Sequence, residues 1–393
     1  MSIELRPLGV ACNIACQYCY QNSLRDVAAT TPKFDFDAVT SAADAMDEPL
    51  NLFGGEPLLL PLADIERLIR FNCERFGRAP LIQSNGALLT PDHVAVFGRY
   101  GAKVGISVDG PGALNDARWA GSLKRTRVST AATLLAIDLL LDAGLCNGIM
   151  VQIGRANGVG ERLDELCTWL AELDRKGVPS ARIHVLELDG TAARAAHGLS
   201  VAENVIAVTR LVELAKGFQT LRFDISSDRR DMLMMDDEAV ACTFRACDPL
   251  VTEAVVGLGG DGEPHKCGLT DKEGIDFLKA DEPRHERYLA LYHTPQAYGG
   301  CHDCRFFLVC KGQCPGSAIE GDWRNRSDNC EAWRQLFAHA EAELVAEGSM
   351  PISIHPRRPE VEAVLVDAWS RGENPTLASL RGTLGLDLAG SQP

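Results

Sequence analysis

The stretch GVACNIACQYCYQN, residues 9–22, places three cysteines, Cys12, Cys16 and Cys19, within eight positions. A closed structural metal site takes four protein ligands, and zinc sites commonly include histidine. No histidine lies within thirty residues of the triplet, which disfavours zinc. On a cubane iron–sulfur cluster, three thiolates leave one iron free to bind a small molecule. The stretch therefore predicts a cluster whose open position is the functional part.

The composition of the chain narrows its class. It has 393 residues, a length that allows one large domain plus a smaller one, or two to three ordinary domains. Hydrophobic residues make up 46% and charged residues 24%, the balance of a soluble globular protein. The net charge of −15 argues against nonspecific nucleic-acid binding. No apolar run reaches the roughly 18 residues of a membrane helix, and residues 1–6 lack a signal-peptide profile. We therefore expect a cytoplasmic protein with neither nucleic acid nor membrane as a partner.

The fourteen cysteines are clustered. Eight fall between residues 242 and 330 and three in the opening stretch, while Cys73, Cys146 and Cys167 stand alone. Clustered cysteines in a reducing compartment indicate metal or iron–sulfur ligands, because disulfides are rare there. The three lone cysteines are expected to pack as small hydrophobic side chains.

Over residues 1–225, short apolar runs alternate with amphipathic stretches, which predicts βα units and a parallel sheet. Six repeats are fewer than the eight of a closed barrel, so the expected fold is α/β, a partial (β/α)6 barrel. The cysteine triplet follows the first strand, at the edge where such barrels carry their active sites. The expected strands are Ile3–Leu8, Leu50–Phe53, Leu81–Ser84, Lys103–Ser107, Gly148–Ile153 and Arg182–Leu188. The expected helices are Leu62–Phe76, Ser129–Ala143 (apolar nearly all round and so well buried), Asp164–Lys176 and Val201–Lys216.

Residues 236–345 have a different character, rich in glycine and cysteine with few long periodic runs before a helix at Glu331–Glu347. We expect a separate domain there that bound metal helps to fold. Residues 350–393 form a tail with one expected helix, Glu360–Ser370, which could be a lid, a docking surface or packing. GLGGDG (257–262) is not followed by a helix, so it predicts a hairpin turn and not a dinucleotide-binding loop.

The triplet, with Tyr18 just before its last cysteine, resembles the signature of the radical S-adenosylmethionine (radical SAM) enzymes. Three further stretches end successive expected strands and support the resemblance: FGGEP (53–57), SNG (84–86) and SVDGP (107–111). The resemblance implies a [4Fe-4S] cluster on the triplet that binds S-adenosylmethionine. It also implies cofactor contacts, with Tyr18 near the adenine, Glu56 near the methionine amino group, and Ser107 and Asp109 by the ribose; Gly54, Gly55 and Pro57 complete that set.

The second group of cysteines resembles the SPASM extension of these enzymes, including a glycine, Gly262, between Cys247 and Cys267. By resemblance to sulfatase-maturing members, two auxiliary [4Fe-4S] clusters are expected. The first would use Cys242, Cys247, Cys267 and Cys314, and the second Cys301, Cys304, Cys310 and Cys330. On spacing alone, Cys301, Cys304, Cys310 and Cys314 could instead form a zinc ribbon, but that leaves four clustered cysteines without a role.

The resemblance implies an oxidoreductase that cleaves S-adenosylmethionine to a deoxyadenosyl radical, which abstracts a hydrogen from the substrate. It implies an external electron donor such as a flavodoxin or ferredoxin. A ribosomal precursor peptide is the leading substrate and a carbon–carbon or thioether cross-link the leading product. No leader-peptide-binding domain is evident before the first strand. A catalytic acid or base is not identified by the sequence.

Three other functions stay open. In sulfatase-maturing members an aspartate that acts as base follows the cysteine matching Cys267, whereas this chain has Gly268, with Asp271 as a distant substitute; this disfavours formylglycine-type maturation. A dehydrogenase of a small-molecule alcohol, on the same cofactor, is a second alternative. A non-enzymatic electron carrier is a third, and FGGEP and SVDGP argue against it.

Several polar and sulfur-containing side chains are possible substrate contacts with simpler explanations. Arg118 and KRTR (124–127) form a basic patch that could hold an acidic peptide, although a solvated face is the commoner explanation. His184 and Asp189 flank the sixth expected strand, where a buried histidine and a turn aspartate are ordinary. MLMM (232–235) could line a pocket, but core packing is more common.

Overall fold

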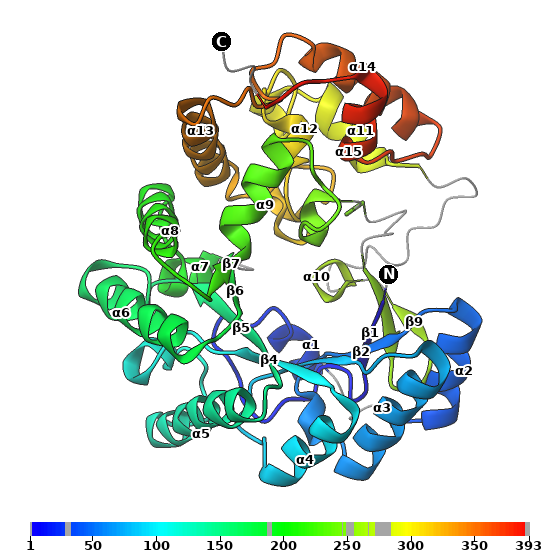
Figure 1. Ribbon diagram of the computed structural model, residues 1–393, viewed down its shortest axis with the longest axis vertical. Helices are drawn as coiled ribbons and strands as arrows, with labels where there is room; N and C mark the ends of the chain where they lie inside the picture. The colour runs from blue at the N-terminus through cyan, green and yellow to red at the C-terminus, as the bar shows by residue number, and fades with distance from the viewer. Residues whose placement is uncertain are drawn as a thin grey trace. The chain divides into compact units, whose positions relative to one another are not determined.

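The computed structural model describes residues 2–27, 33–186, 191–245, 247–248, 255–265, 267–271 and 284–389, shown in Figure 1. The chain divides into two compact units. The first comprises Met1–Phe223 and Val256–Gly268, and the second comprises Asp224–Val255 and Leu269–Pro393. Within the described ranges, no helix is long and apolar enough to cross a membrane.

The first unit is built on a nine-stranded sheet in the order β7-β6-β5-β4-β3-β2-β1-β8-β9. Every neighbouring pair is parallel except the β8–β9 hairpin. The six expected strands are present, with ends that differ by a few residues. The strands are β1 (Ile3–Arg6), β2 (Leu50–Leu52), β3 (Leu81–Ser84), β4 (Lys103–Ser107), β5 (Cys146–Ile153), β6 (Ser180–Val185), β7 (Arg222–Phe223), β8 (Val256–Gly259) and β9 (Pro264–His265).

The sheet is strongly curved. Burial raises the pKa of the Glu4 carboxyl on β1, and the guanidinium groups of Arg6 and of Arg182 on β6 oppose that shift. β1 and β6 stand five places apart in the sheet, which in a flat sheet would be about 24 Å. A charge at that distance would be screened, so β6 must curl back toward β1. Figure 1 shows the resulting arc of strands with helices on its outer side, as the partial barrel predicts.

Helices follow the strands as the alternating pattern predicts. α4 begins after Thr90, whose hydroxyl accepts from the His93 N–H, and α8 begins with a capping box between Ser200 and Glu203. The helices of this unit are α1 (Asn22–Val27), α2 (Phe36–Met46), α3 (Leu62–Phe76), α4 (Pro91–Tyr100), α5 (Leu123–Asp142), α6 (Gly160–Lys176), α7 (Thr191–His197) and α8 (Val201–Ala215), with 3-10 turns η1 (Pro57–Leu59) and η2 (Gly112–Asn115).

One expectation for this unit is wrong. α5 is not buried nearly all round, because Val128 and Leu135 on its outer face are 65% and 62% exposed. The sheet also includes a strand from beyond the six expected repeats. The chain returns to the sheet at β8, which pairs with β1 from Ile3↔Val256 to Arg6↔Gly259. This pairing extends the sheet beyond the sixth repeat and places the 256–268 hairpin in the first unit.

The second unit is helical, and its core includes residues of the 350–393 tail, for which packing was one of the expected roles. Trp369 and Ile352 are fully buried there, and the N–H of Met350 donates to the Leu388 carbonyl at 2.9 Å. The apolar periodicity of 352–388 is therefore a packing signal. The helices are α9 (Asp224–Leu233), α11 (Glu286–His293), α12 (Phe307–Cys310), α13 (Cys330–Ala346), α14 (Arg358–Ser370) and α15 (Leu377–Leu384); the short α10 (Gly268–Asp271) begins at the last residue of the first unit.

Candidate functional site

The cysteine triplet lies on the loop that follows β1, at the carboxyl edge of the sheet. Two backbone hydrogen bonds fasten the loop to the segment after η2: the Ala15 N–H donates to the Trp119 carbonyl at 2.7 Å, and the Gln17 N–H to the Ala117 carbonyl at 2.8 Å. The loop is thereby held between β1 and the segment that follows β4.

The three thiols lie within electrostatic reach of one another, and each is a free cysteine. Burial raises the pKa of Cys16 to about 12, and the neighbouring thiols Cys19 and Cys12 add to that shift. The Arg25 guanidinium donates to the Cys19 sulfur at 2.9 Å. Thiols so buried become thiolates only when a metal replaces their protons. Three convergent sulfurs with a cationic donor beside them fit an iron–sulfur cluster with one open iron.

FGGEP packs directly against this loop. The N–H groups of Gly55 and Glu56 donate to the carbonyls of Gly9 and Ala11 at 3.0 and 2.9 Å. A Cβ at Gly55 would lie 2.1 Å from the Ala11 carbonyl oxygen. Glycine is therefore required here for the close approach of two backbones. The motif sets the shape of the cysteine loop.

The Glu56 side chain is 1% exposed and binds the protein itself. Its carboxylate accepts from the Ser84 hydroxyl and the Asn85 N–H, both at 2.8 Å, and from the Leu58 N–H at 3.0 Å. Burial raises its pKa, and these hydrogen bonds oppose the shift. Glu56 thus joins the ends of β2 and β3, so SNG and FGGEP form one structural element.

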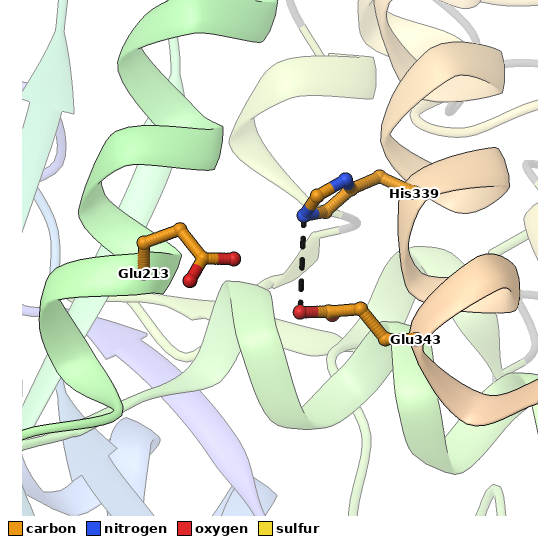
Figure 2. Close-up of side chains that lie close together, drawn as sticks. All are labelled: Glu213, His339 and Glu343. Carbon is orange, nitrogen blue, oxygen red and sulfur yellow. Dashed lines mark ion pairs between the residues drawn. The ribbon is translucent and has the colours of Figure 1, made fainter. Parts of the chain in front are cut away.

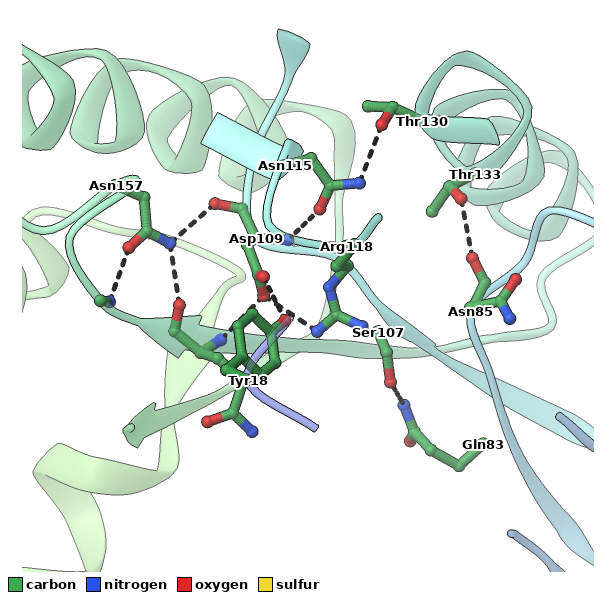
Figure 3. Close-up of polar contacts among 12 residues, drawn as sticks. Tyr18, Gln83, Asn85, Ser107, Asp109, Asn115, Arg118, Thr130, Thr133 and Asn157 are labelled. Atoms are coloured by element: carbon green, nitrogen blue, oxygen red, sulfur yellow. Dashed lines mark hydrogen bonds and ion pairs between the residues drawn. The ribbon is translucent and has the colours of Figure 1, made fainter. Parts of the chain in front are cut away.

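Asp109 is the centre of a buried polar network, shown in Figure 3. Its carboxylate accepts from the Tyr18 hydroxyl, from the Arg118 guanidinium at 2.9 Å and from the Gln152 N–H at 3.0 Å. Asn157 donates to its backbone carbonyl at 2.9 Å. The Arg118 charge also lowers the Cys16 pKa, against the effect of burial. The network therefore reaches the cysteine loop.

This network unites two predicted residues, Tyr18 and Asp109, and adds a residue that the sequence analysis had interpreted otherwise. Arg118 is not part of a surface patch with KRTR, since it is 8% exposed and pairs with Asp109. The sequence contained one indication of this pairing, since Arg118 lies nine residues after Asp109 of the SVDGP motif. Ser107 lies at the end of β4 and accepts from Gln83 at 2.9 Å.

The second unit contains a small cavity lined by four cysteines, Cys301, Cys304, Cys310 and Cys330. These are the four predicted for the second auxiliary cluster. Burial raises the pKa of Cys301 to about 12, and the nearby thiols Cys330 and Cys304 add to the shift. Arg334 and Gln313 also line the cavity. The spacing alternative, a zinc ribbon with Cys314, would need a thiol that does not line it.

Two arginines place positive charge beside this cavity. Arg326 makes a side-chain hydrogen bond to Cys330, and the charges of Arg326 and Arg334 oppose the rise in the Cys330 pKa that burial causes. The Arg326 guanidinium is held by the carbonyls of Gln296 and Gly300, each at 2.7 Å. Four sulfurs with one cationic hydrogen-bond donor and a second positive charge nearby form a donor set suited to a cluster whose charge is partly neutralised.

The other predicted ligands occupy both units. Cys242 starts a 3-10 turn, and Cys247 and Cys314 are buried, all in the second unit. Cys267 belongs to the first unit, where it lies within electrostatic reach of Tyr20. The lone cysteines lie where expected: Cys73 on α3, Cys167 on α6 and Cys146 at the start of β5.

The remaining candidates have structural explanations. Burial lowers the pKa of His184 on β6 to about 4, so it is neutral. Met232 and Met235 belong to the core of the second unit, and GLGGDG forms the β8–β9 hairpin as predicted. Asp189 lies outside the described residues. On α13, His339 and Glu343 form an ion pair of 3.8 Å one helical turn apart (Figure 2).

Residues 7–166 match the family model of the Radical SAM superfamily. Serine-type anaerobic sulfatase-maturating enzymes are similar to the chain over part of its length. That of Bacteroides thetaiotaomicron is 28% identical over 127 residues, which is 29% of this chain and 30% of the relative. That of Klebsiella aerogenes is 31% identical over 151 residues, 35% of this chain and 36% of the relative. The chain thus spans about a third of the length of these curated relatives.

Solved structures extend the similarity of fold to most of the chain. A structure of anSMEcpe with bound AdoMet has a TM-score of 0.65 and 15% identity, covering 88% of this chain and 98% of that one. Streptococcus suis SuiB, bound to its precursor peptide SuiA, has a TM-score of 0.51 and 12% identity, covering 83% and 74%. At such identities the likeness concerns the fold, which these maturases and this chain share.

Proposed function

Because residues 7–166 match the family model of the Radical SAM superfamily, we propose that the chain is an oxidoreductase that modifies a peptide or protein with a radical made from S-adenosylmethionine. The observation that carries the proposal is the convergence of the Cys12, Cys16 and Cys19 thiols beside the buried Asp109 network. An iron–sulfur cluster on these thiols supplies, when bound, the electron for reductive cleavage of S-adenosylmethionine.

The residues of the chain position and shield this chemistry. Arg118 and Tyr18 fix the Asp109 carboxylate, which is 2% exposed, so it can orient a cofactor ribose without rotating. Glu56 fixes the end of β2 and thereby the backbone that faces the methionine group. The proposed cofactor contacts are Tyr18, Gly54, Gly55, Glu56, Pro57, Ser107 and Asp109.

Two further clusters are proposed, giving three in all. Cys301, Cys304, Cys310 and Cys330 hold one, supported by the cavity that they line. Cys242, Cys247, Cys267 and Cys314 hold the other, on the SPASM resemblance alone. An external flavodoxin or ferredoxin supplies electrons. Full reconstitution should give about twelve iron atoms per chain, and serine at Cys310 should remove about a third of them.

Two peptide oxidations fit this scaffold. The sulfatase-maturating relatives favour oxidation of a serine or cysteine to formylglycine. Gly268 favours instead a cross-link in a ribosomal peptide, because it stands where sulfatase-maturing members carry the aspartate base.

Cleavage of S-adenosylmethionine tests the family chemistry. Anaerobically reconstituted, reduced protein should produce 5′-deoxyadenosine, and a variant with alanine at Cys12, Cys16 and Cys19 should produce none. Absence of cleavage by fully loaded protein would refute the proposal.

Product analysis separates the substrate classes. The protein is incubated with the Kp18Cys peptide that anSMEcpe binds, with short peptides encoded beside its gene, and with aminocyclitol alcohols. A product that reacts with a hydrazine reagent identifies formylglycine. Loss of two hydrogens without an aldehyde identifies a cross-link, and oxidation of the alcohols alone refutes a peptide substrate.

A further inference from the structure

Gln313 lies between two cysteines of the second unit, Cys310 and Cys314, and lines the cavity described above. Its side chain is buried, at 3% exposed. Apart from cysteines, the other residues that line the cavity are Gly312, phenylalanines and Arg334, whose side chain is 47% exposed. Gln313 therefore places a buried neutral amide in a wall that is otherwise sulfur and aromatic rings. Burying an amide is costly unless it is hydrogen-bonded, so the contacts of this amide indicate its role.

The amide of Gln313 is directed at Cys310. Its Nε2 donates to the Cys310 carbonyl oxygen at 3.2 Å and to the Cys310 sulfur at 3.7 Å. An amide nitrogen carries two N–H donors, so it can serve both acceptors at once. A carbonyl oxygen can only accept, which places the nitrogen of the amide, and not its oxygen, on this side. One N–H of Gln313 therefore points at a sulfur that is proposed to bind iron.

The backbone around Gln313 has a conformation that glutamine seldom adopts. Lys311, Gly312 and Gln313 have φ angles of 51, 74 and 59°, in the left-handed region, where asparagine is enriched among residues other than glycine. The fully buried Arg287 guanidinium holds this segment, since it donates to the carbonyls of Lys311 at 3.1 Å and Gly312 at 3.2 Å. Such a conformation persists where the surrounding structure enforces it, and it is concentrated at functional sites. Here it brings the amide onto Cys310.

A hydrogen bond to a ligand sulfur changes how readily an iron–sulfur cluster takes up an electron. Reduction makes the cluster and its sulfurs more negative, so an N–H donor stabilises the reduced form more than the oxidised form and raises the reduction potential. The charges of Arg326 and Arg334 lie near Cys330. Gln313 acts on a different ligand, Cys310, and does so without a charge of its own.

We propose that Gln313 tunes the cluster held by Cys301, Cys304, Cys310 and Cys330, the second-unit cluster, by donating to the Cys310 sulfur and raising the potential at which this cluster accepts an electron. The inference rests on the proposed function, which supplies the cluster and the external electron donor. It deepens that function by naming the residue through which the fold sets how readily the cluster is reduced. It also explains why a left-handed position between two cluster ligands carries glutamine, because asparagine would be too short to reach the sulfur.

Potentiometric titration monitored by EPR tests the proposal on the reconstituted full chain. The signal that Cys310→Ser removes belongs to the second-unit cluster. Gln313→Met keeps an unbranched side chain and removes the donor. The equilibrium constant for one-electron reduction should fall about 3- to 10-fold, which corresponds to a potential lower by about 30–60 mV at about 59 mV per tenfold change. Gln219→Met is the control, because the exposed Gln219 amide donates to a backbone carbonyl in the first unit and should leave the potential unchanged.

Gln313→Asn decides the question if Gln313→Met binds less iron than the unmodified chain. Asparagine tolerates the left-handed backbone and keeps an uncharged amide, but its shorter side chain withdraws the N–H from the sulfur. It should therefore lower the potential in the same direction, whereas a role in packing alone would leave the potential of a fully loaded cluster unchanged.

The results separate this inference from the proposed function. An unchanged or higher potential in a fully loaded Gln313 variant overturns the inference and leaves the cluster in place. If Cys310→Ser removes neither iron nor an EPR signal, the second-unit cluster itself is refuted and the role of Gln313 with it.

Discussion

The buried ion pair between Arg118 and Asp109 should be costly to break. Both side chains are buried, at 8% and 2% exposed, and their atoms are 2.9 Å apart. Replacing Arg118 with methionine keeps an unbranched apolar stem and removes the guanidinium and its charge. The Asp109 carboxylate is then left buried with the Tyr18 hydroxyl and the Gln152 N–H as its remaining donors.

Removing one partner of a buried pair costs about 3–5 kcal/mol, because the other charge stays desolvated. Because two hydrogen-bond donors to the Asp109 carboxylate remain, we expect the loss of stability to be about 3 kcal/mol. Each hydrogen bond to the ionised carboxylate retains part of its stabilisation. If the folded unit loses that much stability, the opening that exposes its slowest amides becomes easier. These amides should then exchange roughly 100-fold faster.

Hydrogen exchange followed by mass spectrometry measures this effect in peptides from β4 and β5, separately from the second unit. Arg127→Met is the matched control, because Arg127 also pairs with an aspartate but is exposed; it should change exchange little. Removing both charges, with Asp109→Asn and Arg118→Met together, should cost less than the sum of the single changes.

Two results would refute this reasoning. One is that Arg118→Met accelerates exchange no more than Arg127→Met does. The other is strict additivity in the double variant, which would mean that the two charges do not interact. S-adenosylmethionine binding, measured in parallel, should fall with Arg118→Met because Asp109 is no longer held in one orientation.

Three further predictions concern the cluster sites. Gly55→Ala should lower the iron content of the cysteine triplet, because the added Cβ would lie 2.1 Å from a carbonyl oxygen of the loop. Gly98→Ala is the control, because the nearest atom to its added Cβ would be 3.9 Å away. Equal iron contents in the two variants would contradict the argument from close backbone approach. Arg326→Gln should lower the reduction potential of the second-unit cluster by on the order of 50 mV, since it removes a cationic donor to a ligand sulfur. Potentiometric titration monitored by EPR measures the potential, with Arg324→Gln as the exposed control. An unchanged or higher potential would exclude this role of Arg326. The affinity of the cysteine triplet of the apoprotein for iron should rise with pH, because burial raises the pKa of Cys16 to about 12 and its thiol must lose a proton to bind. The affinity should change about tenfold per pH unit for that proton. A flat profile between mildly acidic and mildly alkaline pH would show that Cys16 is not a ligand.

Features that depend on the local spacing of residues could be predicted from the sequence alone. The cysteine triplet, FGGEP, SNG and SVDGP each end or follow a strand, and a parallel sheet brings such ends to one edge. Helical periodicity placed α3 and α8 almost to the residue. These features are local, so neighbouring residues alone could indicate them.

Tertiary structure decided what depends on contacts between distant residues. β8 is short and glycine-rich, and only its pairing with β1 makes it a strand and assigns 256–268 to the first unit. Residues 352–388 carry apolar side chains among charged ones, and only the fold places those apolar side chains in the core of the second unit. In the sequence Arg118 resembles a surface charge, and only the fold pairs it with Asp109. Arg6 likewise resembles an ordinary strand residue, and only the fold brings it near Gly268 and Tyr20. Burial and electrostatic pairing are properties of the folded chain, so no local pattern of residues could specify them.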